Sequence, residues 1–373
     1  MPGTATPRAT RSKRRSVTIH DVARRAGVST ATVSRALADP SRVAEPTRRA
    51  VFAAIEAIGF TPNAAARSLR ARSTKMVLTL LNGIGDSFYT AILNAIESSL
   101  FEAGYGMIMG DIRNDIGREQ HYDRLVRSGQ VDGVMLFSGR LPREGFEKLD
   151  PSVPILLLCN DIPGVRGLQV IEVANRDAAF EMVTYLIGQG HRRIAHVTGP
   201  IHSVEAQERL RGFREAAAAA GLAPADVTVW EGAFTFEAGA AAARRFLATA
   251  VRPTAVFCAN DQLAIGFIKA LRDVGLAVPA DVSVAGFDDI DYGNLFSPAL
   301  TTMRQPRAEL GRRAAEYLVA RMAGDRKLPR PERLPCTLVI RDSVGPWRPS
   351  GRERPAAQGV PAATRLSAAP RER

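Results

Sequence analysis

The chain of 373 residues is poor in cysteine, and its three cysteines are scattered. Cys159, Cys258 and Cys336 form no C-x-x-C pair and have no histidine at ligand spacing. Neither a disulfide framework nor a zinc site is indicated. We therefore expect no metal and no cofactor.

Long apolar runs are missing as well. No stretch of about eighteen consecutive apolar residues occurs, and the basic N-terminus lacks the apolar segment of a signal peptide. These absences predict a protein that remains in the cytoplasm.

Sequence signatures of catalysis are almost absent. There is no P-loop and no dinucleotide fingerprint. The segment Gly85-Asp86-Ser87-Phe88 resembles the nucleophile block of GDS-type serine hydrolases, which also need a downstream D-x-x-H to supply the base. No such motif exists here, and no histidine follows His202. We therefore expect no enzymatic activity.

Acidic residues are scarce at the two ends of the chain. Residues 1–75 contain fifteen Lys and Arg against four Asp and Glu, a net charge of +11, and residues 344–373 carry +4. Residues 76–343 are nearly neutral at −3. A basic N-terminal module on a neutral body is typical of a protein that binds phosphates. A merely solvated basic surface is the alternative.

The most informative stretch is 18–37, T-I-H-D-V-A-R-R-A-G-V-S-T-A-T-V-S-R-A-L. Thr18 with Asp21 three residues later has the pattern of a capping box, and Gly27 can adopt the left-handed conformation that ends a helix. Ser29 then predicts the start of a second helix. Two short helices joined by a tight turn predict a helix-turn-helix, with an ordinary helical hairpin as the alternative.

The outer face of the second helix is small and polar, and Arg35 can donate two hydrogen bonds to a guanine in a major groove. The pattern T-I-x-D-V-A-x-x-A-G-V-S-x-x-T-V-S-R-x-L closely resembles the DNA-binding headpiece of the LacI/GalR family of bacterial transcription regulators. The resemblance implies DNA contacts from Thr18, Ser29, Thr30, Ala31, Thr32, Ser34 and Arg35.

The headpiece is predicted to span residues 17–60, preceded by a disordered basic arm at 1–16. A third helix is expected from about Glu45 to Ile58. It lacks a side-chain cap, because Ala44 stands where the family usually has serine.

Residues 61–75 are predicted to be a hinge helix and linker. F-T-P-N-A-A-A-R-S-L resembles the family's hinge helix, which is too short to be stable unless it pairs with its dimer mate on DNA. The resemblance implies that Leu69 wedges into the minor groove and that Asn63 and Ala66 contact the DNA. An alanine-rich linker is the alternative.

Residues 76–343 alternate short apolar runs with amphipathic segments of helical length. This alternation predicts buried parallel strands in a doubly wound α/β architecture. The seven runs are M-V-L-T-L-L, Y-G-M-I-M-G, V-D-G-V-M-L-F, P-I-L-L-L-C, R-R-I-A-H-V-T, T-A-V-F-C-A and V-S-V-A-G-F.

Polar and aromatic side chains follow these runs, where ligands bind in such sheets. Their chemistry suits a small hydroxylated ligand. They are Asp86, Ser87, Phe88, Tyr89, Asn160, Asp161, Ser203, Glu205, Asn260, Asp261, Asp288 and Asp289.

The segments G-H-R-R-I-A-H-V-T-G-P, E-R-L-R-G-F and D-V-S-V-A-G-F-D-D resemble the regulatory core of the same family, which shares its fold with periplasmic sugar-binding proteins. The implied fold class is an all-α helix-turn-helix headpiece plus a periplasmic-binding-protein-like α/β core of two doubly wound lobes, discontinuous in sequence, with the chain crossing back to the first lobe around Asp291. The resemblance places the effector against Phe88, Ser203, Arg209, Phe234, Asn260 and Asp288.

Several of these effector residues have a structural alternative. Asn260 and Asp288 could serve only as helix caps, and Phe88 could be a core residue. Glu205 would disfavour an anionic effector, which favours a neutral sugar or polyol.

The C-terminal residues 344–373 are rich in Pro, Ala and Arg and are predicted to be disordered. They contain no leucine repeat for a helical bundle, which favours a homodimer. The sequence therefore predicts a nucleoid-associated transcriptional repressor that binds a pseudo-palindromic operator in double-stranded DNA under the control of a small-molecule effector. A sugar-transport protein would share the core, but it would need export and would have no use for the basic N-terminus.

Overall fold

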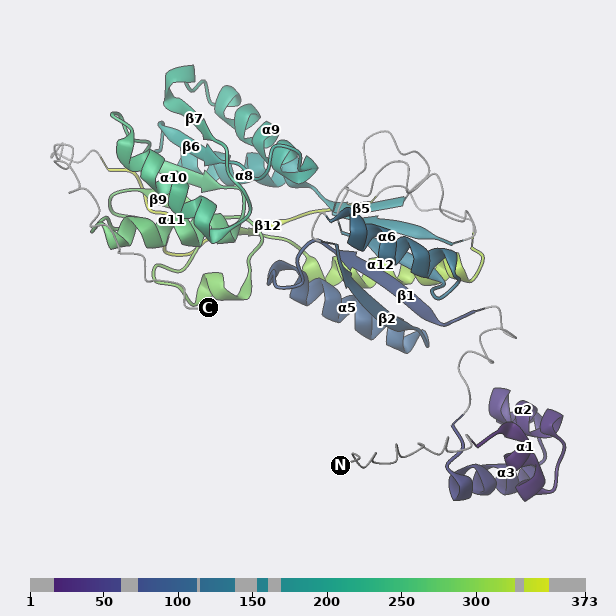
Figure 1. Ribbon diagram of the computed structural model, residues 1–373. Coiled ribbons are helices and arrows are strands. Elements are labelled where there is room, and N and C mark those ends of the chain that lie inside the picture. The colour runs from purple at the N-terminus through teal and green to yellow at the C-terminus, as the bar shows by residue number, and fades with distance from the viewer. Residues whose placement is uncertain are drawn as a thin grey trace, which may run out of the picture. The chain divides into compact units, whose positions relative to one another are not determined.

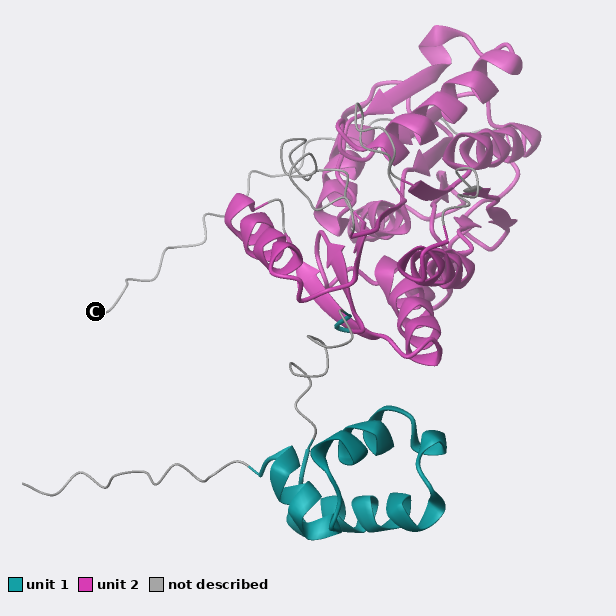
Figure 2. Cartoon of the chain, turned by 90° about the vertical axis from the view of Figure 1, so that its right-hand side faces the viewer, with its two compact units in different colours: residues 1–74 teal, residues 75–373 magenta. Residues whose placement is uncertain are grey.

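The chain divides into two compact units, residues 1–74 and residues 75–373, which Figure 2 distinguishes by colour. The computed structural model describes residues 17–61, 73–112, 115–137, 153–159, 169–325 and 332–348. The expectations for the N-terminal arm, for the hinge residues Asn63, Ala66 and Leu69, for Asn160 and Asp161, and for the tail after residue 348 lie outside these residues.

Residues 17–61 of the first unit form three helices around a small apolar core. Val22, Val33 and Val51 come from one helix each and are fully buried in one cluster. No side chain caps the third helix after Ala44, and Pro46 stands in its first turn, as expected. The helices are α1 (Ile19–Ala26), α2 (Thr30–Ala38) and α3 (Glu45–Ile58), with a 3-10 turn at Pro40–Arg42.

The first lobe of the second unit has a six-stranded parallel sheet in the order β11-β5-β4-β3-β1-β2. Its strands are β1 (Met76–Leu81), β2 (Gly106–Asp111), β3 (Gly133–Leu136), β4 (Ile155–Leu158), β5 (Gln169–Val173) and β11 (Glu332–Leu334). Its helices are α5 (Phe88–Glu102), α6 (Ile116–Arg127) and α12 (Arg307–Met322). Helix α12 lies beside α5, although more than two hundred residues separate them in sequence (Figure 1).

The second lobe has a four-stranded parallel sheet in the order β7-β6-β8-β9. The strands are β6 (Ile194–Val197), β7 (Val227–Trp230), β8 (Ala255–Cys258) and β9 (Ser283–Ala285). The helices are α8 (Asn175–Gly188), α9 (Val204–Ala219), α10 (Phe236–Ala248) and α11 (Asp261–Asp273), with 3-10 turns at Pro224–Asp226 and Asp291–Asn294.

The chain passes between the lobes more than once. It leaves the first lobe after β5 and returns to it with α12 and β11. The return comes after Leu300 and not around Asp291 as expected, because Ile290 and Leu300 on either side of that turn are buried in the second lobe. The last described residues lie in the second lobe, where Val344 is buried and Trp347 donates its backbone N–H to the Gln189 carbonyl, so the expectation of disorder from residue 344 is wrong for residues 344–348. Strands β10 (Thr302–Arg304) and β12 (Thr337–Val339) form an antiparallel pair on two of these passages. Both lobes are therefore assembled from separated segments of sequence.

Strand residues alternate between two buried faces of each sheet. In β1, Val77 and Leu81 belong to a cluster with residues of α5 and α12, whereas Leu78 and Leu80 belong to another that contains Val126 of α6. A strand covered on both faces needs apolar side chains at consecutive positions. This burial explains why the strands read as continuous apolar runs, and all seven expected strands are confirmed.

Strands β5 and β7 are not predicted by the apolar-run pattern. In β5, Gln169 and Glu172 interrupt the run. Gln169 is buried, and Glu172 pairs with Arg333 at 2.5 Å. Strand β7 lies at an edge of its sheet and is mostly half-buried. A strand at an edge does not need a continuous apolar run.

Glycines let neighbouring helices approach through their backbones. Gly212 of α9, Gly311 of α12 and Gly266 of α11 each face a backbone carbonyl oxygen of the helix packed against them. A Cβ atom at any of these positions would overlap with that oxygen. Glycine is therefore required by the helix packing rather than by the local backbone conformation.

Replacing Gly266 by alanine should lower the free energy of unfolding by about 2 kcal/mol, because the new methyl group overlaps with the Phe236 carbonyl and α10 must shift. Gly188→Ala is the matched control, since a Cβ atom added there meets no atom within 4 Å, and it should be neutral or stabilising by up to about 1 kcal/mol. Urea denaturation of both variants measures the difference. Equal midpoints for the two variants would contradict tight packing of α10 on α11.

His196 of β6 is a polar side chain inside the core of the second lobe. Its ring stacks on those of Phe213 and Phe257, with centroids 5.1 and 4.8 Å away. Nδ1 lies 2.9 Å from the Phe257 carbonyl oxygen and must carry the proton, since a carbonyl only accepts. Nε2 has no hydrogen-bond partner within the described part of the chain. Burial lowers the pKa of His196 to about 4.

The lowered pKa predicts a specific loss of stability in acid. Between pH 6.5 and the folded pKa, the unfolded chain binds a proton at this histidine that the folded protein does not, so stability falls as the pH falls. His196 should remove about 2 kcal/mol between pH 6.5 and pH 5. His196→Leu should flatten this part of the stability profile, whereas the exposed His202→Leu should not. Urea titrations at several pH values test this, and parallel profiles for all three proteins would contradict it.

Candidate functional site

The residues predicted to begin and end α1 and α2 stabilise the turn between these two helices. The Thr18 backbone N–H donates to Asp21 Oδ2 at 2.9 Å, and Gly27 ends α1 in the left-handed conformation with φ of 67°. Ser29 caps α2, its Oγ accepting from the Thr32 backbone N–H at 3.2 Å. These local contacts set the angle at which α2 leaves α1.

Apart from Arg35, the outer face of α2 carries small side chains. Ala31 and Arg35 are exposed, and Thr30, Thr32 and Ser34 are half-buried. The guanidinium of Arg35 makes only a long contact of 3.4 Å, from Nε to the Ala31 carbonyl. A helix with this surface fits closely into a major groove, and its arginine can reach base edges.

A cavity in the second unit is lined by residues of both lobes and encloses about 510 Å³ of empty space, part of it open to solvent. From the first lobe it is lined by Asp86, Phe88, Tyr89, Phe137, Cys159 and Val173. From the second lobe and its connections it is lined by Asn175, Glu205, Arg209, Phe234, Asn260, Asp288 and Gln305.

Five of the six predicted effector residues therefore line one cavity, and Ser203 does not. Ser203 caps α9, accepting from the Ala206 backbone N–H at 3.1 Å and donating to Glu205 Oε2 at 2.6 Å. Its neighbour Glu205 lines the cavity instead. An effector contact from Ser203 stays a prediction.

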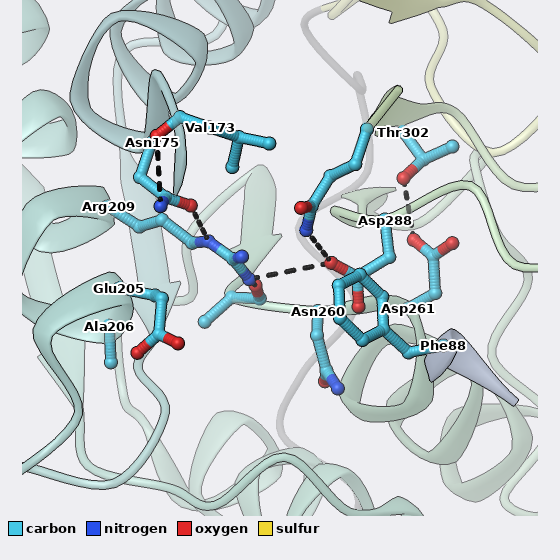
Figure 3. Close-up of polar contacts among 12 residues, drawn as sticks. Phe88, Val173, Asn175, Glu205, Ala206, Arg209, Asn260, Asp261, Asp288 and Thr302 are labelled. Atoms are coloured by element: carbon cyan, nitrogen blue, oxygen red, sulfur yellow. Dashed lines mark hydrogen bonds and ion pairs between the residues drawn. The ribbon is translucent and has the colours of Figure 1, made fainter. Parts of the chain in front are cut away.

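Arg209 is the buried cation of this cavity, with 4% of its surface exposed. Figure 3 shows its contacts: Nε donates to Asn175 Oδ1 at 2.8 Å, and Nη1 lies 3.7 Å from Asp288 Oδ1. Nη1 also donates to the Ala259 carbonyl at 2.5 Å, and the guanidinium lies 3.8 Å from the centroid of the Phe287 ring. These contacts fix the plane of the guanidinium at the cavity wall.

Asp288 faces Arg209 from the connection after β9. Its φ of 120° is rare for a residue with a side chain, and Oδ1 also accepts from Gln305 Nε2 at 2.6 Å. Burial raises the pKa of Asp288 well above its usual range, against the opposing effect of Arg209. A strained backbone that presents a buried carboxyl to a cavity is typical of a binding site.

Asn260 both caps a helix and lines the cavity. Its Oδ1 accepts from the Leu263 backbone N–H at 2.9 Å at the start of α11. The capping alternative raised by the sequence is therefore correct for Asn260. It does not exclude a ligand contact, because Nδ2 donates to none of the described residues. Phe88 and Phe234 are half-buried and present rings to the same cavity.

Asn175 and Gln305 are cavity residues that the sequence pattern does not predict. Asn175 lies two residues after the end of the missed strand β5, so its position at a carboxyl end could have been recognised only with that strand. Gln305 follows β10 and donates a hydrogen bond to Asp288, a contact that no local sequence pattern predicts.

Two side chains connect the first lobe to the second at the edge of the cavity. Asp86 Oδ1 accepts from Gln262 Nε2 of α11 at 2.8 Å. Arg307 of α12 donates from Nη2 to the Asp289 carbonyl at 2.7 Å and from Nη1 to the Ser87 carbonyl at 3.4 Å. A change in the contents of the cavity can thus alter contacts between the lobes.

Among the described residues there is no helix long and apolar enough to cross a membrane. The same part of the chain holds no group of three or more His, Cys, Asp or Glu side chains arranged to bind a metal ion.

A helix-turn-helix unit joined to a two-lobed α/β unit with a polar cavity defines a class, the ligand-responsive DNA-binding regulators. Comparison with known proteins agrees with this class. Residues 18–63 match the profile of bacterial regulatory proteins of the lacI family, and residues 183–344 match that of the periplasmic binding protein-like domain. The HTH-type transcriptional repressor CytR of Escherichia coli K12 is 35% identical over 327 residues, which cover 88% of this chain and 96% of CytR. The chain therefore belongs to the LacI family.

Solved structures support the same assignment. The Lac repressor dimer bound to operator and the anti-inducer ONPF is similar with a TM-score of 0.80 and 27% identity, over 89% of this chain and 100% of that one. The transcriptional regulator CelR in complex with cellobiose has a TM-score of 0.67 and 32% identity, over 88% and 99% of the two chains. The protein is a DNA-binding transcriptional regulator with an effector-binding core.

Proposed function

We propose that the protein acts as a homodimeric repressor whose operator affinity changes when a small hydroxylated molecule fills the cavity between its lobes. The observation that carries the proposal is the buried Arg209–Asp288 pair on the cavity wall. Buried charges are costly unless they are paired, and in this pair they are also directed at space large enough for a small ligand.

The proposed DNA contacts come from the headpiece and hinge. Two copies of α2 would read successive major grooves of a pseudo-palindromic operator. In this proposal residues 17–60 read the bases, Asn63, Ala66 and Leu69 act within the hinge at 61–75, and residues 1–16 and 344–373 are accessory. The Lac repressor structure that resembles this chain is a dimer on its operator, which supports the arrangement.

The proposed effector contacts combine ring faces with hydrogen-bonding groups. Phe88 and Phe234 would pack on a sugar ring, while Asp288 accepts from hydroxyls and Arg209 and Asn260 donate to ring or hydroxyl oxygens. The similar CelR structure contains cellobiose, which supports a carbohydrate-like ligand. The ligand can shift operator affinity only by the difference between its affinities for the two lobe arrangements.

The proposal includes no catalysis and places the protein in the cytoplasm, on the nucleoid. Ser87 begins no catalytic triad in the sequence, since no histidine follows His202. The related CytR is a transcriptional repressor, which also favours regulation over catalysis.

Selection from a pooled library of short duplexes by the full chain tests the function. We expect enrichment of a palindrome, with binding that weakens steeply as salt rises. Repeating the selection with individual sugars should then identify one that releases or strengthens binding. Steep salt dependence without any sequence enrichment would leave only phosphate contact and contradict a repressor.

A further inference from the structure

The described lining of the cavity is acidic, in contrast with the net charge of +12 of the chain. Asp86, Glu205 and Asp288 contribute three carboxyl groups, against a single guanidinium from Arg209. Hydroxyl groups of a sugar need acceptors, but a neutral sugar needs no excess of negative charge. The charge of this lining therefore carries information about the ligand.

Each carboxyl group has one oxygen engaged by the protein. Asp86 Oδ1 accepts from Gln262 and from the Phe88 backbone N–H, and Glu205 Oε2 accepts from the Ser203 hydroxyl. Asp288 Oδ1 accepts from Gln305 and lies opposite Arg209. Within the described residues the second oxygen of each group accepts no hydrogen bond from another residue. Three acceptors therefore remain for a ligand.

Arg209 cannot neutralise all three groups. Its Nη1 faces Asp288 and the Ala259 carbonyl, and its Nε is bonded to Asn175. Neither Asp86 nor Glu205 has an ion pair within the described residues, because their partners are neutral amide, hydroxyl and backbone groups. Arg307 lies near enough to Asp86, and Arg209 near enough to Glu205, to favour their ionised forms, but neither arginine forms an ion pair with them. A cationic group on the ligand can therefore pair with either carboxylate.

Glu205 occupies a particular position among these groups, because it also lines a second cavity of about 420 Å³. The two cavities share Cys159, Val173, Asn175 and Glu205. Together they are lined by six carboxylates and three arginines. The carboxylates are Asp86, Glu172, Asp177, Glu205, Glu208 and Asp288, and the arginines are Arg176, Arg209 and Arg333.

The two arginines of the second cavity are already paired. Arg333 lies 2.5 Å from Glu172, and Arg176 lies 2.7 Å from Glu215, which lines neither cavity. Glu208 is also paired, with Arg211 at 2.6 Å, whereas Asp177 and Glu205 have no ion pair among the described residues. The excess of negative charge thus continues from the first cavity to Asp177 in the second, with Glu205 at the junction. An anionic ligand would be repelled along this whole path, and a cation would be attracted.

We propose that the effector is a hydroxylated molecule that carries a cationic amino group, and that this group binds Glu205 where the two cavities meet. The inference rests on the proposed function, since it names the chemical class of the ligand of that site. An ammonium group donates three hydrogen bonds and supplies the missing positive charge. Burial raises the pKa of Glu205 and of Asp86, and a bound cation would favour their ionised forms again.

Matched pairs of compounds test the inference on the full chain near neutral pH. The probes are D-glucosamine with D-glucose, D-galactosamine with D-galactose, and ethanolamine with ethylene glycol, the last pair being too small for shape to exclude. We expect at least one amino compound to bind about tenfold more tightly than its hydroxyl partner, the usual contribution of a charged hydrogen bond. Calorimetric titration and the shift in melting temperature measure the preference.

Two variants locate the charge responsible. Glu205→Gln keeps the shape of the side chain and should abolish most of the preference for the amino compound. Asp273→Asn is the control, because it removes a charge at the C-terminal end of α11, where Asp273 is exposed and paired with Lys269. This variant should leave the preference unchanged. Equal loss in both variants would indicate a general charge effect and would overturn the assignment to Glu205.

The outcomes separate this inference from the proposed function. If no amino compound binds better than its partner, including a panel in which nothing binds, the cationic ligand is ruled out. A neutral sugar that binds and alters operator affinity would also rule out the cationic ligand, but it would support the proposed repressor function. Failure to select any operator would instead contradict the proposed function, whatever binds in the cavity.

Discussion

Replacing Arg209 by methionine should abolish measurable effector binding and lower the free energy of unfolding by about 3 kcal/mol. The substitution leaves Asp288 buried without its counter-charge and removes the hydrogen bonds to Asn175 and to the Ala259 carbonyl. The ligand also loses the planar donor that the cavity presents. Chemical denaturation and calorimetric titration measure the two effects separately.

Two further variants serve as controls for the Arg209 substitution. Arg211→Met removes an exposed arginine of the same helix that pairs with Glu208, and it should change stability by less than about 1 kcal/mol. The double variant Arg209→Met with Asp288→Asn should recover part of the stability, because no unpaired charge remains, but it should not recover binding. Unchanged binding in the single variant would place the effector elsewhere.

Replacing Arg35 by alanine should remove discrimination between operator and random DNA. An arginine that bonds guanine through two hydrogen bonds contributes about 1–3 kcal/mol per base pair. A dimer would lose this twice, so operator affinity should fall by roughly thirtyfold or more. Effector binding should be retained, since Arg35 belongs to the separate headpiece unit. Competition binding with operator and scrambled duplexes measures the specificity ratio.

The control for Arg35 is another exposed arginine of the headpiece. Arg49 lies on α3, 75% exposed and paired with Glu45, and Arg49→Ala should weaken operator and scrambled DNA alike. A specificity ratio that survives in Arg35→Ala would remove this residue from the surface that reads the bases.

The headpiece could be predicted almost completely from the sequence, because its determinants are local. The Thr18–Asp21 contact, the hydrogen bond from the Gly27 backbone N–H to the Ala23 carbonyl and the Ser29 cap each join residues at most four positions apart. Such contacts form wherever the pattern occurs, and they place Arg35 on the outer face of α2. Seven strands of the core were predicted for a related reason, since burial on both faces demands continuous apolar runs.

The cavity was only partly predictable. The carboxyl ends of strands pointed to Asn260 and Asp288, and the family resemblance added Arg209 and Phe234. In the structure Ser203 caps α9 and Glu205 lines the cavity. The sequence could not distinguish these roles, because the side-chain oxygens of both residues can accept from the free backbone N–H groups at the start of a helix. Strand β5 was missed, and Asn175 was missed with it.

The sequence by itself determined the helix-turn-helix, the alternating α/β architecture and the kinds of side chain available at strand ends. Only the tertiary structure decided which charges meet. Arg209 is balanced by Asp288, seventy-nine positions later in sequence, whereas Glu205, four positions away, stays without an ion pair among the described residues. Electrostatic energy depends on distance and burial in the folded chain, and neither quantity is encoded in the spacing of residues along it.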